Sequence, residues 1–376
     1  MPYVTMFLSP RTHQLTLEEI LKGEVKILPQ PTHRSTTSTI TRFIETPSPQ
    51  MLRQYNIAAL KSKIVTFNRY YQHLHEADRH SLYHSFRIPK RSGGLRQIDQ
   101  PNEELMKALR ELVSIFRNDF CALYHTAAFA YVKGRSTIDS VKKHQMHRSR
   151  WFLKIDFENF FGSTTLKFLM SMLEKIFPFS EVMRDDEGRM ELTRAVSLCF
   201  LDDGLPQGTP ASPMLTNLMM IPIDYEISKS LTPDGFIYTR YADDSLISHS
   251  RSFMFTDMCR RIEEILGKFQ APFAIKKTKT RYGSSAGANW NLGVMLNKDN
   301  EITIGHQKKK IYKSMICNYL QDRRDGTSWS LEDIRHLMGL TAYYRMVEPH
   351  CIDEIIAKYN QKFGTDFMRC MRSDLA

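Results

Sequence analysis

The chain has no long apolar run, and from its opening residues we expect no secretory leader; each of these points argues against a class of protein. No stretch of its 376 residues approaches the 18 apolar residues that a membrane-spanning helix needs. The opening residues, MPYVTMFLSPRTHQ, have neither the basic segment nor the apolar core of a signal peptide. We therefore expect a cytoplasmic protein that does not bind a membrane.

Cysteine is scarce and scattered. No two of the six cysteines form a CxxC pair or stand at metal-ligand spacing; they are Cys121, Cys199, Cys259, Cys317, Cys351 and Cys370. This argues against a zinc module and against a disulfide framework. We expect reduced thiols, several of them buried as small apolar side chains.

What the chain does have is excess positive charge. Its 52 Lys and Arg residues outnumber 41 Asp and Glu residues, which gives a formal net charge of +11. Such an excess favours a polyanionic partner, because neutralising phosphates releases counterions. Charge alone leaves open an ordinary basic protein with no nucleic acid partner.

The length suits two or three packed subdomains.

The predicted elements follow an α+β order and do not alternate strictly between strand and helix. Residues 86–101, FRIPKRSGGLRQIDQP, predict two strands joined by a tight turn at the Ser-Gly-Gly sequence. Residues 102–120 predict a helix that Asn102 caps. Residues 236–250 predict a hairpin with Ala-Asp-Asp at its tip, and residues 306–376 are mostly helical.

Acidic residues mark the candidate chemistry. Asp243 and Asp244 are adjacent at the hairpin tip, where their mutual repulsion calls for a cation. An exposed acidic turn is the alternative, because Asp favours turns. Asp156 ends the apolar strand that begins at Trp151 and supplies a third carboxylate. Two hard divalent ions about 3.5–4 Å apart need such oxygen ligands, so the pattern favours metal-assisted phosphoryl transfer.

Six blocks, in this order, resemble the reverse transcriptase family, and its bacterial members above all. They are FRIPKRSGGLRQI, KIDFENFF, GLPQGTPASPMLTNL, YADD, KKTKT and NLGV. The resemblance implies an RNA-templated DNA polymerase with a right-hand fold of fingers, palm and thumb. The palm would be an antiparallel sheet backed by helices, and the thumb would be helical.

The resemblance also implies a division of the chain into three parts. An N-terminal helical extension would span residues 1–85. The fingers and palm would span residues 86–305, and the helical thumb would span residues 306–376.

Catalytic roles follow from the matched motifs. Asp156 and Asp243 would ligate both metals, and Asp244 would ligate less directly. The carbonyl of Phe157 would complete the metal shell. The cofactor would be two Mg²⁺ ions, with Mn²⁺ as a possible substitute.

Phe161, five residues after Asp156, matches the aromatic gate that excludes a ribose 2′-hydroxyl. Phe160 stands beside it, and one of the two must face inward, so core packing is the alternative for Phe161. The alternation of neighbouring side chains favours Phe161 as the gate.

Other matched positions imply contacts to nucleotide. Lys90 and Arg96 lie on the two arms of the 86–101 hairpin and would grip the triphosphate, although ordinary solvated charge is the alternative. Gln207 would lie beside the sugar and base of the incoming nucleotide. Lys279 would steady the triphosphate or protonate the leaving pyrophosphate, unless it belongs to a solvated charged face.

The last group would contact nucleic acid. Gly293 lies in the block that resembles the primer grip. Lys308, Lys309 and Lys310, at the predicted thumb entrance, would contact the backbone of the duplex.

No segment resembles an RNase H, integrase or HNH domain, so the chain is most similar to retron-type bacterial enzymes. Two stretches depart from that pattern. The segment 140–144, SVKKH, keeps only the His of an Asn-Ala-x-x-His block, and residues 292–294, LGV, replace Val-Thr-Gly. These departures leave open a second branch, the antiphage defence-associated reverse transcriptases that work with a dedicated non-coding RNA. The resemblance implies cDNA synthesis in the bacterial cytoplasm from such an RNA, in antiphage defence. The partners would be the RNA template, the DNA product and dNTPs.

Three alternatives stay open. The same fold could add nucleotides without a template or from a protein primer. It could serve as a non-catalytic RNA-binding scaffold, although a scaffold has no use for three converging carboxylates. An unrelated metal-dependent nuclease would need neither the 86–101 hairpin nor the PQG block.

Overall fold

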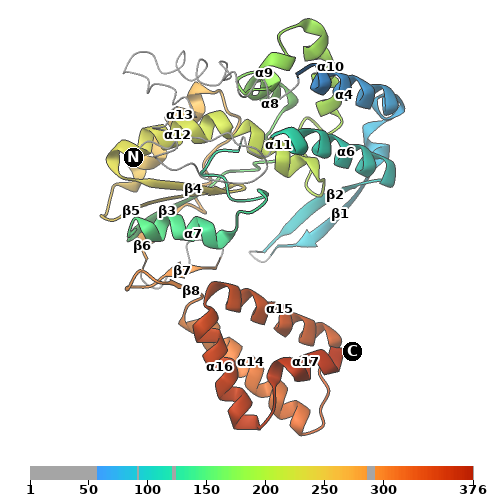
Figure 1. Cartoon of the computed structure of the whole chain (residues 1–376). Helices are drawn as coiled ribbons and strands as arrows, with labels where there is room; N and C mark the ends of the chain where they lie inside the picture. The colour runs from blue at the N-terminus through green and yellow to red at the C-terminus, as the bar shows by residue number, and fades with distance from the viewer. Residues whose placement is uncertain (1–56, 91–92, 121–123, 286–292, 376) are drawn as a thin grey trace, which may run out of the picture. The chain divides into compact units, whose positions relative to one another are not determined.

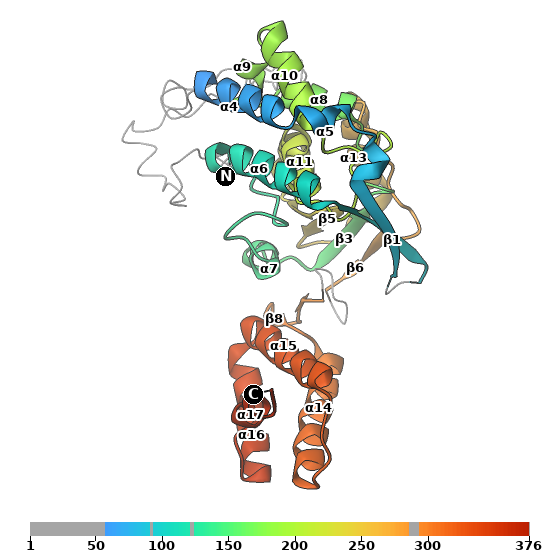
Figure 2. The same ribbon diagram turned by 90° about the vertical axis from the view of Figure 1, so that its right-hand side faces the viewer.

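The computed structural model describes residues 57–90, 93–120, 124–285 and 293–375 (Figure 1, Figure 2). The helices are α4 (Ile57–Tyr70), α5 (Gln72–Glu76), α6 (Glu103–Phe120), α7 (Thr137–Met146), α8 (Leu166–Leu173), α9 (Phe179–Val182), α10 (Asp186–Ser197), α11 (Ala211–Met219), α12 (Ile221–Leu231), α13 (Phe255–Lys268), α14 (His306–Arg324), α15 (Leu331–Val347), α16 (Pro349–Phe363) and α17 (Phe367–Leu375), with 3-10 turns η1 (Arg79–Leu82) and η3 (Thr232–Asp234). The strands are β1 (Tyr83–Pro89), β2 (Leu95–Pro101), β3 (Trp151–Asp156), β4 (Ile237–Tyr241), β5 (Asp244–His249), β6 (Arg281–Ser284), β7 (Met295–Leu296) and β8 (Ile302–Thr303). The α+β class is confirmed.

The chain divides into two compact units. The first comprises Met1–Arg135, Lys154–Ile247 and Met254–Arg281, and the second comprises Ser136–Leu153, Ser248–Phe253 and Tyr282–Ala376. These units follow spatial contacts and not chain order, so the three-part division at residues 85 and 305 stays a prediction. Within the described ranges, no helix has both the length and the apolar character needed to cross a bilayer.

A four-stranded sheet in the order β4-β5-β3-β6 carries the predicted acids. A two-residue turn joins β4 to β5, which makes this pair an antiparallel hairpin, as predicted. Residues of β4, β5 and β3 are buried almost without a break. Because successive side chains point to opposite faces, both faces of these strands are covered. Helix α12 packs against β4 and against α13 (Figure 1).

The β1–β2 hairpin has the opposite character. Its antiparallel register runs from Tyr83 opposite Pro101 to Pro89 opposite Leu95, which confirms the predicted pair of strands. The Lys90 N–H closes the turn on the Gly94 carbonyl at 2.9 Å. Most of its residues are exposed, so the hairpin projects from the first unit as a thin two-stranded ribbon (Figure 2).

Helix α6 follows this hairpin and starts as predicted. The side-chain oxygen of Asn102 accepts the Leu105 backbone N–H at 2.9 Å, which is the N-cap expected from the sequence. One face of α6 is completely buried, with Leu105, Leu109 and Leu112 at 0% exposure. The helix therefore fixes the base of the exposed hairpin to the core of the first unit.

In the second unit, helices α14 to α17 pack on one another, which confirms the predicted helical tail. The hydroxyl of Tyr312 on α14 bonds Thr341 Oγ1 on α15 at 3.0 Å, and the Tyr319 hydroxyl donates to Asp374 on α17 at 2.7 Å. Strands β7 and β8 pair antiparallel, with Met295 opposite Thr303.

The turn before the PQG block depends on one glycine. Gly204 closes a tight turn on Leu201, with both backbone N–H groups bonded at 3.0 Å. It lies so close to Gly162 that an added Cβ would sit 2.5 Å from the Gly162 carbonyl oxygen. A backbone atom cannot move aside as a flexible side chain can, so this contact requires glycine.

Gly204→Ala should therefore destabilise the protein by about 1–3 kcal/mol, as overpacking does. Gly267→Ala is the matched control, because Gly267 is exposed on α13 and its Cβ would meet nothing within 4 Å. It should stabilise the protein by up to about 1 kcal/mol through helix propensity. Urea unfolding measures both, and equal stability of the two variants would contradict the packing at Gly204.

Candidate active site

The β4–β5 turn presents the first candidate carboxylate. Ala242 and Asp243 form the turn between Tyr241 and Asp244. Ala242 has φ +58, in the left-handed region that L residues seldom adopt. Such a conformation persists only where the surroundings hold it.

Asp156, at the end of β3, and Asp243, in the β4–β5 turn, are close enough for their charges to interact. Asp156 ends β3 and is 8% exposed. Burial raises the pKa of the Asp243 carboxyl above its usual value, and the charges of Asp244 and Asp156 raise it further. The ammonium of Lys279 lies 3.2 Å from Asp156 Oδ2 and opposes this shift. The acids are thus close enough to make negative charge costly unless a cation is present.

Asp244 has a cation of its own. Lys154 Nζ, on β3, lies 2.6 Å from Asp244 Oδ2, and both side chains are largely buried. Among the described residues, no three Asp, Glu, His or Cys side chains form a ready-made metal cluster. Of the three predicted acids, Asp244 has the shortest lysine contact, at 2.6 Å. The nearest lysine nitrogen described for Asp156 lies at 3.2 Å.

The segment after Asp156 runs alongside residues 274–276. The Lys276 N–H donates to the Asp156 carbonyl at 2.8 Å, and the Glu158 N–H donates to the Ala274 carbonyl at 2.9 Å. Neither bond uses the carbonyl of Phe157, the residue predicted to add a backbone oxygen to the metal shell. The Phe157 ring is buried, so the peptide next to Asp156 is fixed from both sides.

Phe160 and Phe161 have different surroundings. Phe160 is 3% exposed, and its ring contacts those of Phe157 and Phe273. Phe161 is only half-buried and meets Phe160 edge to face. Core packing is thus the role of Phe160. This leaves Phe161 available as the predicted gate, a role that stays a prediction.

The PQG block packs on the exposed hairpin. The Asp99 N–H of β2 donates to the Gln207 carbonyl at 2.8 Å. Gly208 has φ +119, and a Cβ there would lie 2.9 Å from Ile98. Lys90 and Arg96 are exposed on the same hairpin. The predicted triphosphate grip and the half-buried side chain of Gln207 thus belong to one connected segment of the first unit.

In the second unit, two of the three predicted thumb lysines have partners within the protein. Lys308 Nζ donates to the Gly293 carbonyl at 2.6 Å, and burial lowers the pKa of Lys308. Lys309 Nζ pairs with Glu348 at 2.6 Å. Lys310 is exposed. Contact of these lysines and of Gly293 with nucleic acid stays a prediction, and Lys310 is best placed to make it.

A family model described as reverse transcriptase (RNA-dependent DNA polymerase) matches residues 88–320, which is more than half of the chain. The chain belongs to the reverse transcriptase family. It is 28% identical over 288 residues to the retron Ec83 reverse transcriptase of Escherichia coli, which covers 74% of this chain and 87% of that protein. It is 30% identical over 282 residues to the retron Ec86 reverse transcriptase of the same organism, covering 72% of this chain and 78% of that protein.

A third relative is the retron Mx162 reverse transcriptase of Myxococcus xanthus, 25% identical over 338 residues, which cover 84% of this chain and 67% of that protein. These similarities confirm a bacterial, retron-type reverse transcriptase and an RNA-directed DNA polymerase of right-hand fold. The two departures from the retron pattern do not remove the chain from this group.

His144, the residue kept from the retron block, has a structural environment in this reverse transcriptase. It is completely buried, its Nδ1 lies 2.6 Å from Ser248 Oγ, and its ring packs near Phe152. Burial lowers the pKa of His144 to about 3, so the ring is neutral. This neutral ring joins α7 to β5 and β3 within the second unit.

Sequence reasoning missed Lys154 and a basic groove in the first unit. Arg110 and Arg117 of α6 line a groove of about 560 Å³ together with Tyr131 and Pro213. Burial raises the pKa of Tyr131, and the charge of Asp243 raises it further, so the phenol lies near the acids. The seven-residue spacing of the two arginines on one helix face was the only available signal.

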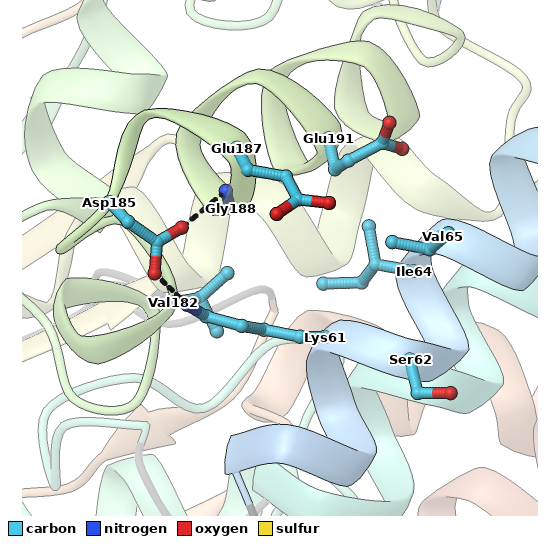
Figure 3. Close-up of a pocket in the computed structure, with 9 residues that line it drawn as sticks. All are labelled: Lys61, Ser62, Ile64, Val65, Val182, Asp185, Glu187, Gly188 and Glu191. Atoms are coloured by element: carbon cyan, nitrogen blue, oxygen red, sulfur yellow. Dashed lines mark hydrogen bonds and ion pairs between the residues drawn. The ribbon is translucent and has the colours of Figure 1, made fainter.

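A second cleft, of about 150 Å³, lies between α4 and α10 and contains none of the predicted site residues (Figure 3). Lys61 reaches across it to pair with Asp185, whose other oxygen accepts the Gly188 N–H at 2.7 Å and caps α10. This arrangement fastens α4 to α10 and accounts for the charges in the cleft.

Asp243→Asn should lower kcat by about 1,000-fold, because it removes a carboxylate without a tight lysine partner from the acid pair. Asp244→Asn should have a smaller effect, because Lys154 already neutralises Asp244. Single-nucleotide extension of a primer–template at saturating Mg²⁺ gives both rates, and urea midpoints check that both variants fold. Equal losses would contradict the separate roles of the two residues.

Proposed function

We propose that this reverse transcriptase copies a dedicated non-coding RNA into cDNA by two-metal phosphoryl transfer at Asp156 and Asp243. The observation that carries the proposal is that the end of β3 and the β4–β5 turn bring Asp156 close enough to Asp243 for its charge to raise the pKa of Asp243, with Lys279 3.2 Å from Asp156. Repulsion of this kind suits a site that receives cations together with a triphosphate.

Asp156, Asp243 and the Phe157 carbonyl offer hard oxygen ligands, which fit Mg²⁺ and also Mn²⁺. Bound there, the ions would supply Lewis-acid polarisation of the primer 3′-hydroxyl and of the phosphates. Lys154 holds Asp244 fixed and keeps its charge from adding fully to the repulsion at Asp243. Lys279 Nζ lies 3.2 Å from Asp156 Oδ2, where the lysine would steady the triphosphate or protonate pyrophosphate.

Lys90 and Arg96 would approach the triphosphate from the exposed hairpin, and Gln207 would lie against the sugar and base. The hydrogen bond between Asp99 and Gln207 supports this proposal, because it couples the hairpin to the nucleotide pocket. If the hairpin moved onto the triphosphate, this hydrogen bond would transmit the movement to Gln207 in the nucleotide pocket.

An RNA template is supported by the groove of Arg110, Arg117 and Tyr131. Guanidinium groups that pair with phosphates, next to an aromatic ring on which bases stack, are the ordinary means of holding a single strand. The net charge of +11 adds long-range attraction. The bacterial cytoplasm and a role in antiphage defence complete the proposal, by analogy with retron-type enzymes.

The test is to purify the protein with its bound nucleic acid, add Mg²⁺ and four dNTPs, and sequence the RNA and the DNA. The control is the double variant Asp243→Ala/Asp244→Ala. DNA complementary to one co-purifying RNA, absent from the control, is the expected result. DNA without an RNA complement would support untemplated synthesis instead. If neither the wild type nor the double variant makes DNA, even on an added primer–template, the result would favour a non-catalytic RNA-binding scaffold.

Phe161→Ala should reduce the discrimination between dNTPs and rNTPs by at least about tenfold, because it removes the ring that would meet the 2′-hydroxyl. Phe160→Ala is the contrasting variant. It should cost about 3–5 kcal/mol of stability by emptying a core site. Competing single-nucleotide insertions and urea unfolding separate the two effects. Unchanged discrimination in Phe161→Ala would assign this ring to packing.

A further inference from the structure

We propose that Arg240 is a positioning residue for polymerisation, which holds the turn carrying Asp243 through a fork anchored on buried Asp224. The inference rests on the proposed function, because it takes Asp243 as a carboxylate that must be held in place. Arg240 lies at the end of β4, and Asp224 lies on α12, which packs against that strand (Figure 1).

The Arg240 guanidinium uses all three of its nitrogens inside the protein. Its side chain and that of Asp224 have 0% exposure. Nε and Nη2 donate to the two Asp224 oxygens at 2.9 and 2.7 Å. Nη1 donates to Asn217 Oδ1 and to the Ala242 carbonyl oxygen, both at 3.1 Å. The arginine therefore joins two helices, α11 and α12, to the turn between β4 and β5.

The bond to Ala242 connects this fork with the active site. Ala242 has φ +58, an unfavourable conformation for an alanine, and the next residue is Asp243. A donor fixed by Asp224 and Asn217 holds the Ala242 carbonyl in the direction that this conformation requires. Losing that donor would free the turn to relax and would move the Asp243 carboxylate.

The same residues also fix the other side of the site. The Arg240 N–H donates to the Ala127 carbonyl at 2.7 Å, and the Phe129 N–H donates to the Arg240 carbonyl at 2.9 Å. Asn217 Nδ2 donates to the Ala130 carbonyl at 2.7 Å. Tyr131 follows directly, and its phenol responds to the charge of Asp243. One buried network thus fixes both the acidic turn and the backbone that leads into Tyr131.

Stability alone does not explain this network. The free-energy cost of removing two charges from water offsets most of the gain from their attraction. An apolar pair of similar volume often stabilises a protein just as much. What an arginine adds is a rigid planar fork with donors in several directions. A lysine in its place would keep the charge beside Asp224, but its single ammonium cannot reproduce that fork. Exchange of Arg for Lys therefore separates charge balance from positioning.

The decisive variant is Arg240→Lys. We expect a folded protein whose kcat is about 10- to 100-fold lower, with primer–template affinity unchanged. Mn²⁺ binding, followed by EPR with a dideoxy-terminated primer–template and dNTP, should weaken by about tenfold. Adding Ala242→Gly should restore part of the lost kcat, because glycine adopts positive φ without steric cost. A purely structural role would show no such rescue.

Arg261→Lys is the matched control. Arg261, on α13, also binds a carboxylate, that of Asp234, and a backbone carbonyl, that of Ser230, but makes no contact with the turn. Its kcat and Mn²⁺ affinity should equal those of the wild type. A loss like that of Arg240→Lys would overturn the specific role of Arg240.

A second variant keeps the test decisive if Arg240→Lys does not fold. Arg240→Met combined with Asp224→Leu removes both charges of this buried pair and should fold. It should show the same loss of kcat and of Mn²⁺ affinity. Wild-type values in either folded variant would overturn the inference. An inactive wild type would instead refute the proposed function, and the Mn²⁺ titrations would still report on Arg240.

Discussion

Repulsion between buried carboxylates is the constraint on which the rest of the active site depends. Asp156 ends β3 and Asp243 lies in the β4–β5 turn, and burial together with neighbouring charge raises the pKa of Asp243. Left alone, such acids would turn toward water or become protonated. The strands that end beside these acids are largely buried on both faces, which favours a fixed backbone at this position. Cations bound nearby would offset this repulsion, as metal-assisted phosphoryl transfer requires.

The protein limits this repulsion with fixed positive groups, each of which has a different task. Lys154 neutralises Asp244, and Lys279 lies beside Asp156. Arg240, neutralised by Asp224, contributes direction more than charge, because its Nη1 donates to the Ala242 carbonyl as well as to Asn217. Around this rigid centre, the chain places its exposed elements: the β1–β2 hairpin, the half-buried Phe161 and the groove of Arg110 and Arg117. A fixed centre with adaptable surroundings suits an enzyme that must accept many successive nucleotides.

Much of the fold and of the acidic site could be predicted from motifs whose residues are neighbours in the sequence. The hairpin around Asp243, the ribbon at residues 86–101 and the cap at Asn102 each depend on neighbouring residues, and the structure confirms them. The partners that hold the site were not predictable, because they are distant in the chain. Lys154 and Asp244 are 90 residues apart, and a lysine in an apolar strand gives no sign of its partner. In the sequence, Asp224 resembles any other acidic residue of a helix. Its pairing with Arg240 becomes evident only from the packing of α12 on β4. The sequence likewise could not say that Lys308 and Lys309 bind within the second unit.

The central claim is that Asp156 and Asp243 serve template-directed synthesis, and nucleotide choice on a defined RNA tests it most directly. The purified protein would receive one DNA primer annealed to four RNA templates that differ only in the next base, with Mg²⁺ and all four dNTPs. The account predicts that each template directs insertion of its complementary nucleotide, and that Asp243→Asn lowers all four rates together. Insertion of the same nucleotide on every template, or unchanged rates in Asp243→Asn, would contradict it.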